Sequence, residues 1–406
     1  MLILGINAAF EESSAALVRD GRIVMAVEEE RLTRVKHAKR ARPCDADALP
    51  WNAIERCLDA AGAKLRDVDA IGFSFAPRRP TGFELHPWST EDPDGERERR
   101  VRGVPALLAA RANASALAER VELLPHHLCH AASAFYTSPF ESAAVLVLDS
   151  VGESTTAWLG RGRGARLSRI EEVPRPHSIG LLWQRLAQWL GWNELDTGKV
   201  RDLAAFGDAS LARDAIDSIL RVGSDDDALP FEVDAAIAAH GGVEELERLL
   251  GPRRVREPVL EVPRFAAAAA ALQERTEEAL LATARRLARA TGETALAYAG
   301  DVAMNAAANA RLEREGPFIS LHVCGAAHDA GTALGAALAL CARFREELLD
   351  ERPVGMALGP AYDERDMERA LLASGLRSRR VSDPCREAAE RIAAGAIVGW
   401  FQDRME

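Results

Sequence analysis

Lysine is almost absent from this chain of 406 residues. Only four of its 51 basic residues are lysines, and the remaining 47 are arginines. Together with the abundance of alanine, this bias is typical of a GC-rich coding sequence, so the arginines alone carry no functional message. The formal net charge of −11 argues against the broad basic surface that nucleic-acid binding needs. We therefore expect no nucleic-acid partner, and instead a cationic, neutral or metal-bound ligand.

Cysteine pairs and long apolar runs are missing as well. The six cysteines include no C-x-x-C pair, so we expect free thiols in a reducing compartment. No run of 18 apolar residues exists, and no membrane span is expected. The initial MLILGINAAF has no basic region of the kind that opens a signal peptide. Together these absences predict a cytoplasmic location and no membrane partner.

The composition that is present is that of an ordinary globular protein. Hydrophobic residues make up 48% and charged residues 28%, which excludes a disordered chain, a collagen-like fibre and a small disulfide scaffold. The length predicts two or three structural units.

The order of the expected strands and helices repeats along the chain. A strand at residues 2–7 precedes apolar runs at 15–19 and 22–28, which flank Asp20-Gly21. This dipeptide is typical of a tight hairpin because both positions tolerate positive φ. The first half continues with the following expected elements: a helix at 51–63, a strand at 70–75, a helix at 104–119 and a strand at 121–124. The second half repeats the order as follows: a strand at 143–149, a hairpin at 155–159 and 166–170, helices at 175–190 and 265–290, and strands at 295–299 and 319–323.

Two β-β-β-α-β-α units around a cleft describe the actin/sugar-kinase/Hsp70 architecture. We therefore predict an α/β fold with duplicated βββαβα lobes, about 1–142 and 143–345, that together form one domain of residues 1–345. Residues 77–103, rich in Pro, Gly and charge, are predicted as a long mobile insertion. Residues 208–263 are predicted as an insertion that carries helices.

The sharpest chemical pattern is His126-x-x-x-His130. On a helix, positions i and i+4 lie on one face, so both imidazoles can reach one ion. Asp149 ends a buried strand, where open α/β sheets present ligand groups, and Asp329 follows another predicted strand. Two histidines and two aspartates suit iron, manganese or zinc. The alternative is a helix start with two histidines and no ion, and His127 and His328 read as hydrogen-bonded neighbours.

Small residues form two further loops. Gly300-Asp-Val-Ala-Met-Asn305 and Gly331-Thr-Ala-Leu-Gly335 each follow a strand and precede a helix. Such turns allow backbone N–H groups to approach a phosphate at a helix N-terminus. The competing interpretation is tight helix packing. The charged run at 28–37 reads either as a solvated face or as the lining of a polar cleft.

At these motifs the chain resembles the ATP-dependent O-carbamoyltransferases, the class that modifies antibiotics and nodulation factors. The resemblance rests on the amino-terminal segment 1–40, on HHLCHAASAFYTSPFESAAVLVLDSVGE, on AGDVAMNAAANARL and on CGAAHDAGTALGAAL. These segments occur in the family's order, and the similarity as a whole covers essentially all of the chain.

The resemblance implies an actin-like metalloprotein domain in an antibiotic-biosynthesis type of transferase. In such enzymes carbamoyl phosphate and ATP yield a carbamoyl adenylate, whose carbamoyl group passes to a hydroxyl of a small-molecule acceptor. By motif match, a divalent metal, commonly iron, with magnesium also possible, would be held by His126, His130, Asp149 and Asp329. The nucleotide would be contacted by Gly152, Glu153, Gly300 and Asn305. Lys36 would line the reaction cleft, and Lys36 and His126 are the implied catalytic residues.

Several positions depart from the family pattern. The family has His-Asp where this chain has Glu11-Glu12, Gly-Gly where it has Gly300-Asp301, Cys at Ala306 and Met-Gly at Arg201-Asp202. A carboxylate at Asp301 would repel a nucleotide phosphate unless it turns away. Acceptor chemistry or nucleotide handling is therefore expected to differ.

The largest departure is at the carboxyl end. Residues 353–406 resemble only the beginning of an α+β domain similar to threonylcarbamoyl-adenylate synthases, and the family's F-G-P-R-A-L-G motif is absent. We expect a fragment, or half of a split enzyme whose partner chain supplies the rest, with an apolar strand at 396–401. Two other functions stay open: a non-catalytic nucleotide- and metal-binding subunit, and a small-molecule kinase on the same fold.

Overall fold

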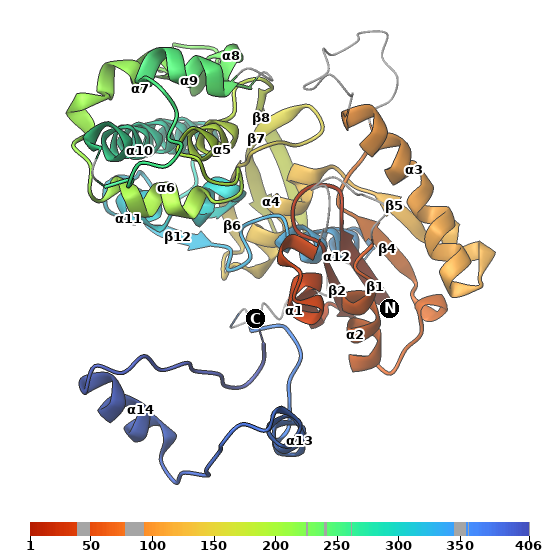
Figure 1. Ribbon diagram of the computed structural model, residues 1–406. Coiled ribbons are helices and arrows are strands. Elements are labelled where there is room, and N and C mark those ends of the chain that lie inside the picture. The colour runs from red at the N-terminus through yellow and green to blue at the C-terminus, as the bar shows by residue number, and fades with distance from the viewer. Residues whose placement is uncertain are drawn as a thin grey trace.

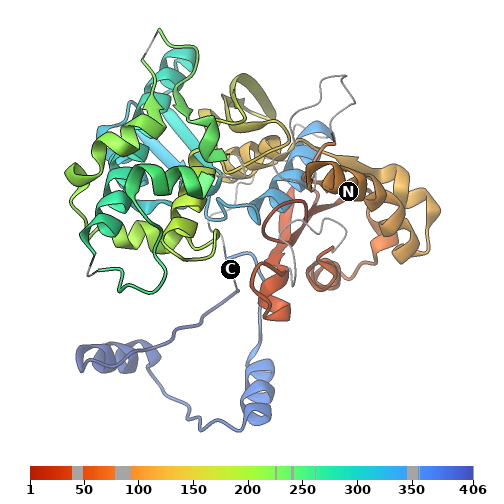
Figure 2. The same ribbon diagram turned by 45° about the horizontal axis from the view of Figure 1, so that its top comes forward.

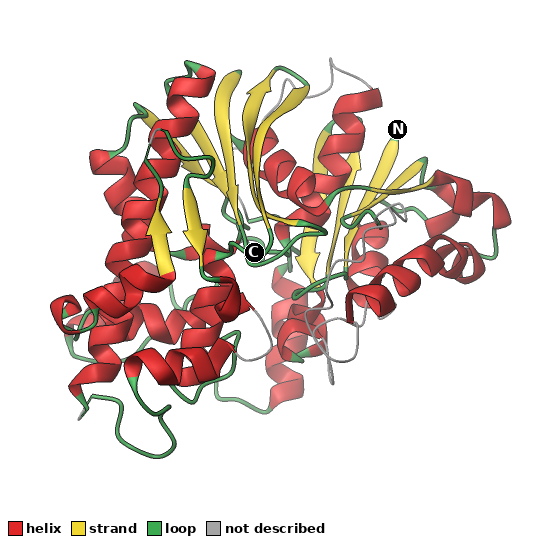
Figure 3. Ribbon diagram, turned by 90° about the horizontal axis from the view of Figure 1, so that it is seen from above, coloured by secondary structure: helices red, strands yellow, loops and turns green. Residues whose placement is uncertain are grey.

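Two five-stranded sheets with the same connectivity form the body of the molecule. The computed structural model describes residues 1–38, 49–77, 93–224, 226–238, 242–260, 262–344, 355 and 357–405. The first sheet has the order β3 (Arg22–Glu28), β2 (Ser14–Arg19), β1 (Leu2–Asn7), β4 (Ala70–Phe73) and β5 (Val121–Leu123). The second has the order β8 (Arg166–Pro174), β7 (Thr155–Arg163), β6 (Ser142–Leu148), β11 (Ala295–Ala299) and β12 (Ser320–Val323). Figure 3 shows the two sheets as separate yellow layers.

The strand directions repeat as well as the order. In each sheet the first three strands form an antiparallel meander, and the last two run parallel to the first. The predicted hairpin at Asp20-Gly21 is confirmed, because Arg19 pairs with Arg22 and the two turn residues have φ of 50° and 83°. The predicted α/β fold with duplicated βββαβα lobes is therefore confirmed by the topology itself.

Helices surround the two sheets (Figure 1). In chain order they are α1 (Glu29–Thr33), α2 (Trp51–Ala60), α3 (Pro93–Ala112), α4 (His126–Thr137), α5 (Ile179–Trp189), α6 (Thr197–Ala204), α7 (Arg213–Ile219), α8 (Ala235–Ala238), α9 (Gly242–Leu250), α10 (Pro263–Thr291), α11 (Ala306–Glu315), α12 (Gly331–Phe344), α13 (Glu364–Ser374) and α14 (Pro384–Ala393). Short 3₁₀ turns lie between them: η1 (Lys36–Ala38), η2 (Leu65–Asp67), η3 (Ser115–Arg120), η4 (Ala209–Leu211) and η5 (Asp301–Met304). The long helix predicted at 265–290 is α10, and Gly292 ends it at φ 68°. No helix in the described ranges combines the length and apolar character that crossing a bilayer demands.

The two insertions differ in part from the expectation. Residues 78–92 of the first lie outside the described residues, but 93–103 belong to helix α3, so the prediction of a loop there is wrong. The charges that suggested a loop pair one helical turn apart, Arg100 with Glu96 and Arg102 with Glu98, and such pairs support a helix. The second insertion carries helices as predicted, together with a small sheet of β9 (Leu220–Val222) and β10 (Phe231–Val233).

Helices α4 and α12 each cover the sheet of the opposite half of the chain. Helix α4 follows β5 of the first sheet but packs on β6, β7 and β11 of the second. Helix α12 follows β12 of the second sheet but packs on β1, β2 and β4 of the first, and the two helices contact each other. A Cβ atom at Gly335 would lie 1.8 Å from the carbonyl oxygen of Cys129. Only glycine permits this approach of the two backbones.

The segment from residue 357 onward stands away from this body, as Figures 1 and 2 show. Helices α13 and α14 bury no residue. The segment returns to the free edge of β3, where Ala26 donates its N–H to Leu358 O (3.0 Å) and Arg404 donates to Val24 O (2.9 Å). The predicted strand at 396–401 is wrong: no strand forms there, because no neighbouring strand pairs with it, and Ile397 is exposed. The assignment of residues 353–406 to a second domain stays a prediction.

Candidate metal centre and adjoining cavities

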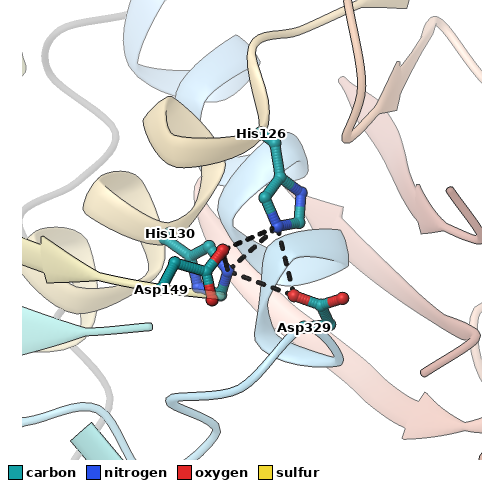
Figure 4. Close-up of side chains that lie close together, drawn as sticks. All are labelled: His126, His130, Asp149 and Asp329. Atoms are coloured by element: carbon teal, nitrogen blue, oxygen red, sulfur yellow. Dashed lines mark hydrogen bonds and ion pairs between the residues drawn. The ribbon is translucent and has the colours of Figure 1, made fainter. Parts of the chain in front are cut away.

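The two histidines and two aspartates of the sequence pattern meet at the junction of the sheets (Figure 4). His126 and His130 begin helix α4, Asp149 follows β6, and Asp329 precedes α12. All four are buried, and one ligand atom from each lies within 4.8 Å of the others. His126 Nε2 is 3.1 Å from Asp329 Oδ1, 3.2 Å from His130 Nε2 and 3.3 Å from Asp149 Oδ2.

Hydrogen bonds around the cluster orient its imidazoles. His126 Nδ1 lies 3.1 Å from the carbonyl oxygen of Ser74. Since a carbonyl only accepts, Nδ1 carries the proton in the neutral ring and the Nε2 lone pair faces the cluster. The Nδ1 of His127 is 2.9 Å from Thr155 Oγ1, and its Nε2 is 3.3 Å from Asp149 Oδ2. Thus His127 is a neighbour of the cluster, as the sequence predicts.

Electrostatics in the cluster keep both carboxylates charged. Burial alone would raise the pKa of Asp149, but His130, His126 and His127 outweigh it and lower this pKa well below the ordinary value. Burial is likewise outweighed at Asp329, where His126 and His130 lower the pKa. Burial lowers the pKa of His130, whereas at His126 the carboxylates of Asp329 and Asp149 overcome burial and raise the pKa. The cluster therefore holds two charged carboxylates beside two imidazoles, which is the kind of ligand set that a cation site requires.

The residues fit a divalent cation. Metal–ligand distances of about 2.0–2.2 Å place tetrahedral ligand atoms roughly 3.4 Å apart, and the ligand atoms around His126 Nε2 lie 3.1–3.3 Å from it. In addition, Asp149 Oδ2, which faces the cluster, is buried without a hydrogen-bond partner among the described residues. Orphaned buried polar atoms are rare in folded proteins. The donor set of two nitrogens and two oxygens suits iron, manganese or zinc better than magnesium.

Two cavities adjoin the cluster. The smaller, of about 150 Å³, is lined by the ligands Asp149 and Asp329 and by Arg97 of helix α3. The larger, of about 250 Å³, is lined by residues of both lobes, among them Glu12 of the first lobe and Gln184 of the second. The cavities share Glu11, Ser150 and Asp301 as walls, so a ligand that spans both would reach the cluster. The larger cavity has an apolar side made of Trp183, Leu195, Val302 and Met304.

Gly152, Glu153 and Lys36, which the resemblance implies as nucleotide-contacting or catalytic residues, line neither cavity. Glu153 Oε1 accepts the backbone N–H groups of His126 (2.9 Å) and Ala76 (2.8 Å), which places it at the start of helix α4. Gly152 lies against the ring of His127, where a Cβ atom would come within 2.8 Å of it. The Lys36 side chain is 70% exposed, and its Nζ is 3.7 Å from Asp196 Oδ1. Their nucleotide-contacting and catalytic roles stay predictions.

The loop that follows β11 does reach the larger cavity. Asn305 lines it, caps helix α11 through Oδ1 to the N–H of Ala308 (3.1 Å) and donates Nδ2 to Gln273 (2.8 Å). Gly300 adopts φ 96°, and a Cβ there would lie 2.2 Å from Leu148 O, so the loop needs glycine. Asp301 does not turn away: its Oδ2 accepts the Ser150 hydroxyl at 2.6 Å, and its N–H donates to Asp149 Oδ1 at 3.2 Å.

Two carboxyl groups in the shared wall have altered acidity. Burial, and then repulsion from Asp301, raises the pKa of Glu11 well above its ordinary value. Burial and the charge of Asp149 do the same for Asp301. Gln184 connects the two groups through Ser150. Its Nε2 donates to Glu11 Oε1 (2.8 Å) and to Ser150 Oγ (3.1 Å), and the Ser150 hydroxyl donates to Asp301. A partly neutral pair of carboxyl groups repels a phosphate less than two charged carboxylates would.

Gln184, Trp183 and Arg97 are wall residues that the sequence does not reveal. Gln184 and Trp183 sit on helix α5, inside an apolar stretch that reads as core, and Arg97 is one of many arginines. Of the two interpretations of the charged run at 28–37, the lining of a polar cleft holds for His37, which lines the larger cavity.

The fold and the buried cluster define a two-lobed α/β protein with a candidate metal centre between its sheets. Residues 2–338 match the family described as "Carbamoyltransferase N-terminus". The chain therefore belongs to the carbamoyltransferase family, and its resemblance to that family is confirmed.

Curated relatives agree with this assignment. The nodulation protein NolNO of Sinorhizobium fredii is 32% identical over 98% of this chain and 57% of its own length. The nodulation protein NolO of Bradyrhizobium diazoefficiens is 32% identical over 69% of this chain and 50% of its own length. An uncharacterised protein of Synechocystis is 35% identical over 100% of this chain and 68% of its own length. The matched part of the chain thus spans 50–68% of the length of these relatives.

Solved structures show more distant likenesses. Component A of (R)-2-hydroxyglutaryl-CoA dehydratase from Acidaminococcus fermentans has a TM-score of 0.46 at 14% identity, over 86% of this chain and 100% of that one. HypF of T. kodakarensis has a TM-score of 0.45 at 13% identity, over 86% of this chain and 49% of its own. These likenesses carry no information about the chemistry of this chain.

Proposed function

We propose that this chain is the transfer domain of an O-carbamoyltransferase. In this proposal it binds a carbamoyl adenylate, made with ATP from carbamoyl phosphate, and passes the carbamoyl group to a hydroxyl of a small-molecule acceptor. The observation that carries the proposal is the buried cluster of two histidines and two aspartates beside two cavities that share wall residues, in a chain of the carbamoyltransferase family.

Each part of the site has a role in this reaction. His126, His130, Asp149 and Asp329 would hold a divalent metal, most simply iron, which supplies Lewis acidity toward the phosphate of the leaving group. Arg97, in the smaller cavity with Asp149 and Asp329, can bind a phosphate oxygen by a charge-assisted hydrogen bond. Trp183, Leu195 and Val302 give part of the larger cavity an apolar lining, which would strengthen electrostatic interactions with the transferred group.

The supply of the adenylate is a separate part of the proposal. Residues 353–406 resemble the beginning of an adenylate-forming domain, and helices α13 and α14 of this segment stand away from the body formed by the two sheets. We therefore assign adenylate formation to further sequence or to a partner chain. Robust carbamoyl phosphate-dependent release of pyrophosphate from ATP by the purified chain alone would overturn this assignment.

The test of transfer supplies carbamoyl adenylate directly. The purified chain, loaded with Fe²⁺, should release AMP from it faster than the buffer does, and the His130→Ala variant should lose this activity together with the metal. The His322→Ala variant is the control, because His322 lies on edge strand β12. Stoichiometric metal without any AMP release would instead select a non-catalytic binding subunit, a function that the acidic wall of Glu11 and Asp301 favours.

A further inference from the structure

One imidazole in the larger cavity lies outside the metal cluster and has an available ring nitrogen. His37 follows Lys36 in turn η1 and lines the cavity with Glu11, Asp301 and Gln184. Its Nδ1 is 3.1 Å from Glu12 Oε1, so the Nδ1–H donates to the carboxylate and the neutral ring has its lone pair on Nε2. Among the described residues Nε2 has no hydrogen-bond partner. A carboxylate that fixes the tautomer of a histidine in this way is the arrangement that general bases use.

The backbone holds His37 in an uncommon conformation for this purpose. His37 has φ 60° and ψ 3°, and the adjacent Ala38 also has positive φ. The N–H of His37 donates to Glu30 Oε2 at 2.6 Å, which fixes the turn from the side of helix α1. Left-handed backbone at non-glycine residues is uncommon and concentrates at functional sites. Glu30 therefore holds the backbone of His37, and Glu12 holds its ring.

The other titratable groups of the cavity are already engaged. His328 accepts the N–H of Ala330 through Nδ1 (3.2 Å), and its Nε2 is 3.5 Å from Glu28. Glu11 receives the amide of Gln184, and Asp301 receives the hydroxyl of Ser150. Glu12 Oε2 also has no hydrogen-bond partner among the described residues, but Glu12 is held by His37 through Oε1. His37 is thus the imidazole of this wall with a ring nitrogen that has no partner in the described part of the chain.

We infer that His37 is the general base that accepts the proton of the acceptor hydroxyl, with Glu12 as its positioning residue. This inference rests on the proposed carbamoyl transfer. In the step, the acceptor oxygen bonds to the carbonyl carbon, and the bond from that carbon to the adenylate oxygen breaks. AMP leaves with the electron pair of that bond, and the hydroxyl proton passes to His37 Nε2 and then to solvent. His37 lines the same cavity as Glu11, Ser150 and Asp301, the three residues that also line the cavity of the metal ligands, so an acceptor there would lie between base and donor.

The experiment compares two nucleophiles with synthetic carbamoyl adenylate and the metal-loaded full chain. Water must lose a proton as it attacks, whereas hydroxylamine attacks through a neutral nitrogen and loses its proton after the bond has formed. The variant is His37→Gly, because glycine accepts φ 60° and leaves a space for imidazole. AMP release with water should fall about 100-fold or more, and hydroxyurea formation with hydroxylamine should fall less than about tenfold. Added imidazole should restore part of the water reaction.

Matched variants separate this role from a structural one. His37→Asn also tolerates positive φ and should show the same split between nucleophiles without rescue, and Glu12→Gln should show a smaller loss with water. The metal content of each variant should equal that of the wild type. An equal loss with both nucleophiles, no loss with either, or no rescue of His37→Gly at full metal content would overturn the inference. Absence of AMP release by the wild type would instead overturn the proposed function, and the inference with it.

Discussion

The two lobes share a sheet topology but differ in what is inserted between their third and fourth strands. In the first lobe the chain passes from β3 to β4 through α1, η1, α2 and η2, whereas in the second it passes from β8 to β11 through α5 to α10. The candidate metal ligands come from parts that both lobes have: the loops and helices after β5, β6 and β12. The cavity walls combine both kinds of part: Ser150 and Asp301 follow the shared strands β6 and β11, whereas His37 of η1 and Gln184 of α5 come from parts that differ. The shared parts therefore supply the candidate metal ligands, and the unshared parts add further side chains to the cavity beside them.

The largest expected effect tests the shared junction. His130→Ala should reduce metal from about one ion per chain to little, because a missing ligand leaves an incomplete coordination sphere. The loss of affinity should exceed the roughly 10–100-fold that removal of an outer-shell partner costs. Metal analysis of purified protein measures it, with His322→Ala as the control. Equal metal in the wild type and the His130 variant would refute the ligand assignment.

A second test breaks the contact between the crossing helices. Gly335→Ala places a Cβ atom against the backbone of Cys129, so we expect a loss of stability of about 1–3 kcal/mol or more. Gly103→Ala is the matched control: that glycine lies in helix α3 with open space around it, and the change should stabilise by about 0.5–1 kcal/mol. Thermal unfolding measures both. Similar melting temperatures for the two variants would contradict the packing described.

Metal affinity should depend on pH in a defined direction. Near Asp329 and Asp149 the pKa of His126 is raised despite its burial, so the metal-free protein keeps this proton to a higher pH than an ordinary histidine does. Binding must displace the proton, and affinity should rise by about tenfold per pH unit while one proton is linked to binding. Titration of Zn²⁺ into weakly buffered protein, followed by a pH indicator, should show proton release. Uptake of Zn²⁺ without release of protons at pH 7 would contradict the assignment of a raised pKa to His126.

The smallest expected effect concerns the wall that the cavities share. Burial and neighbouring carboxylates raise the pKa of Asp301, so the folded state is penalised as pH rises above the ordinary aspartate value. Asp301→Asn should therefore stabilise the metal-free protein at neutral pH by about 1 kcal/mol, and the gain should shrink as the solution becomes acidic. The control is Asp202→Asn, at a side chain that is 70% exposed. A gain that does not change with pH would point to another cause.

Much of the fold could be predicted because its signals are local. Short apolar runs mark the buried strands, and Asp20-Gly21 marks its hairpin. The start of helix α3 was missed because its charges resemble those of a loop, although they pair one turn apart. The three-residue strands β9 and β10 are too short for a periodic signal. In both cases the local pattern was ambiguous and packing decided the structure.

The candidate site divides in the same way. The spacing of His126 and His130 places both rings on one helix face, so their proximity follows from helical geometry. The pairing of His37 with Glu12 spans 25 residues and depends on a left-handed turn that no spacing rule predicts. Residues Gly152 and Glu153 match a family motif, yet their positions are explained by the ring of His127 and by the start of helix α4.

The crossing of α4 and α12 also has a consequence for synthesis on the ribosome. The sheet made from the first 123 residues receives α12 only after Phe344 has emerged. Until then one apolar face of a nearly complete sheet stays exposed to water, a condition that favours aggregation of nascent chains. This protein should therefore depend on chaperones during translation more than a chain whose halves mature one after the other.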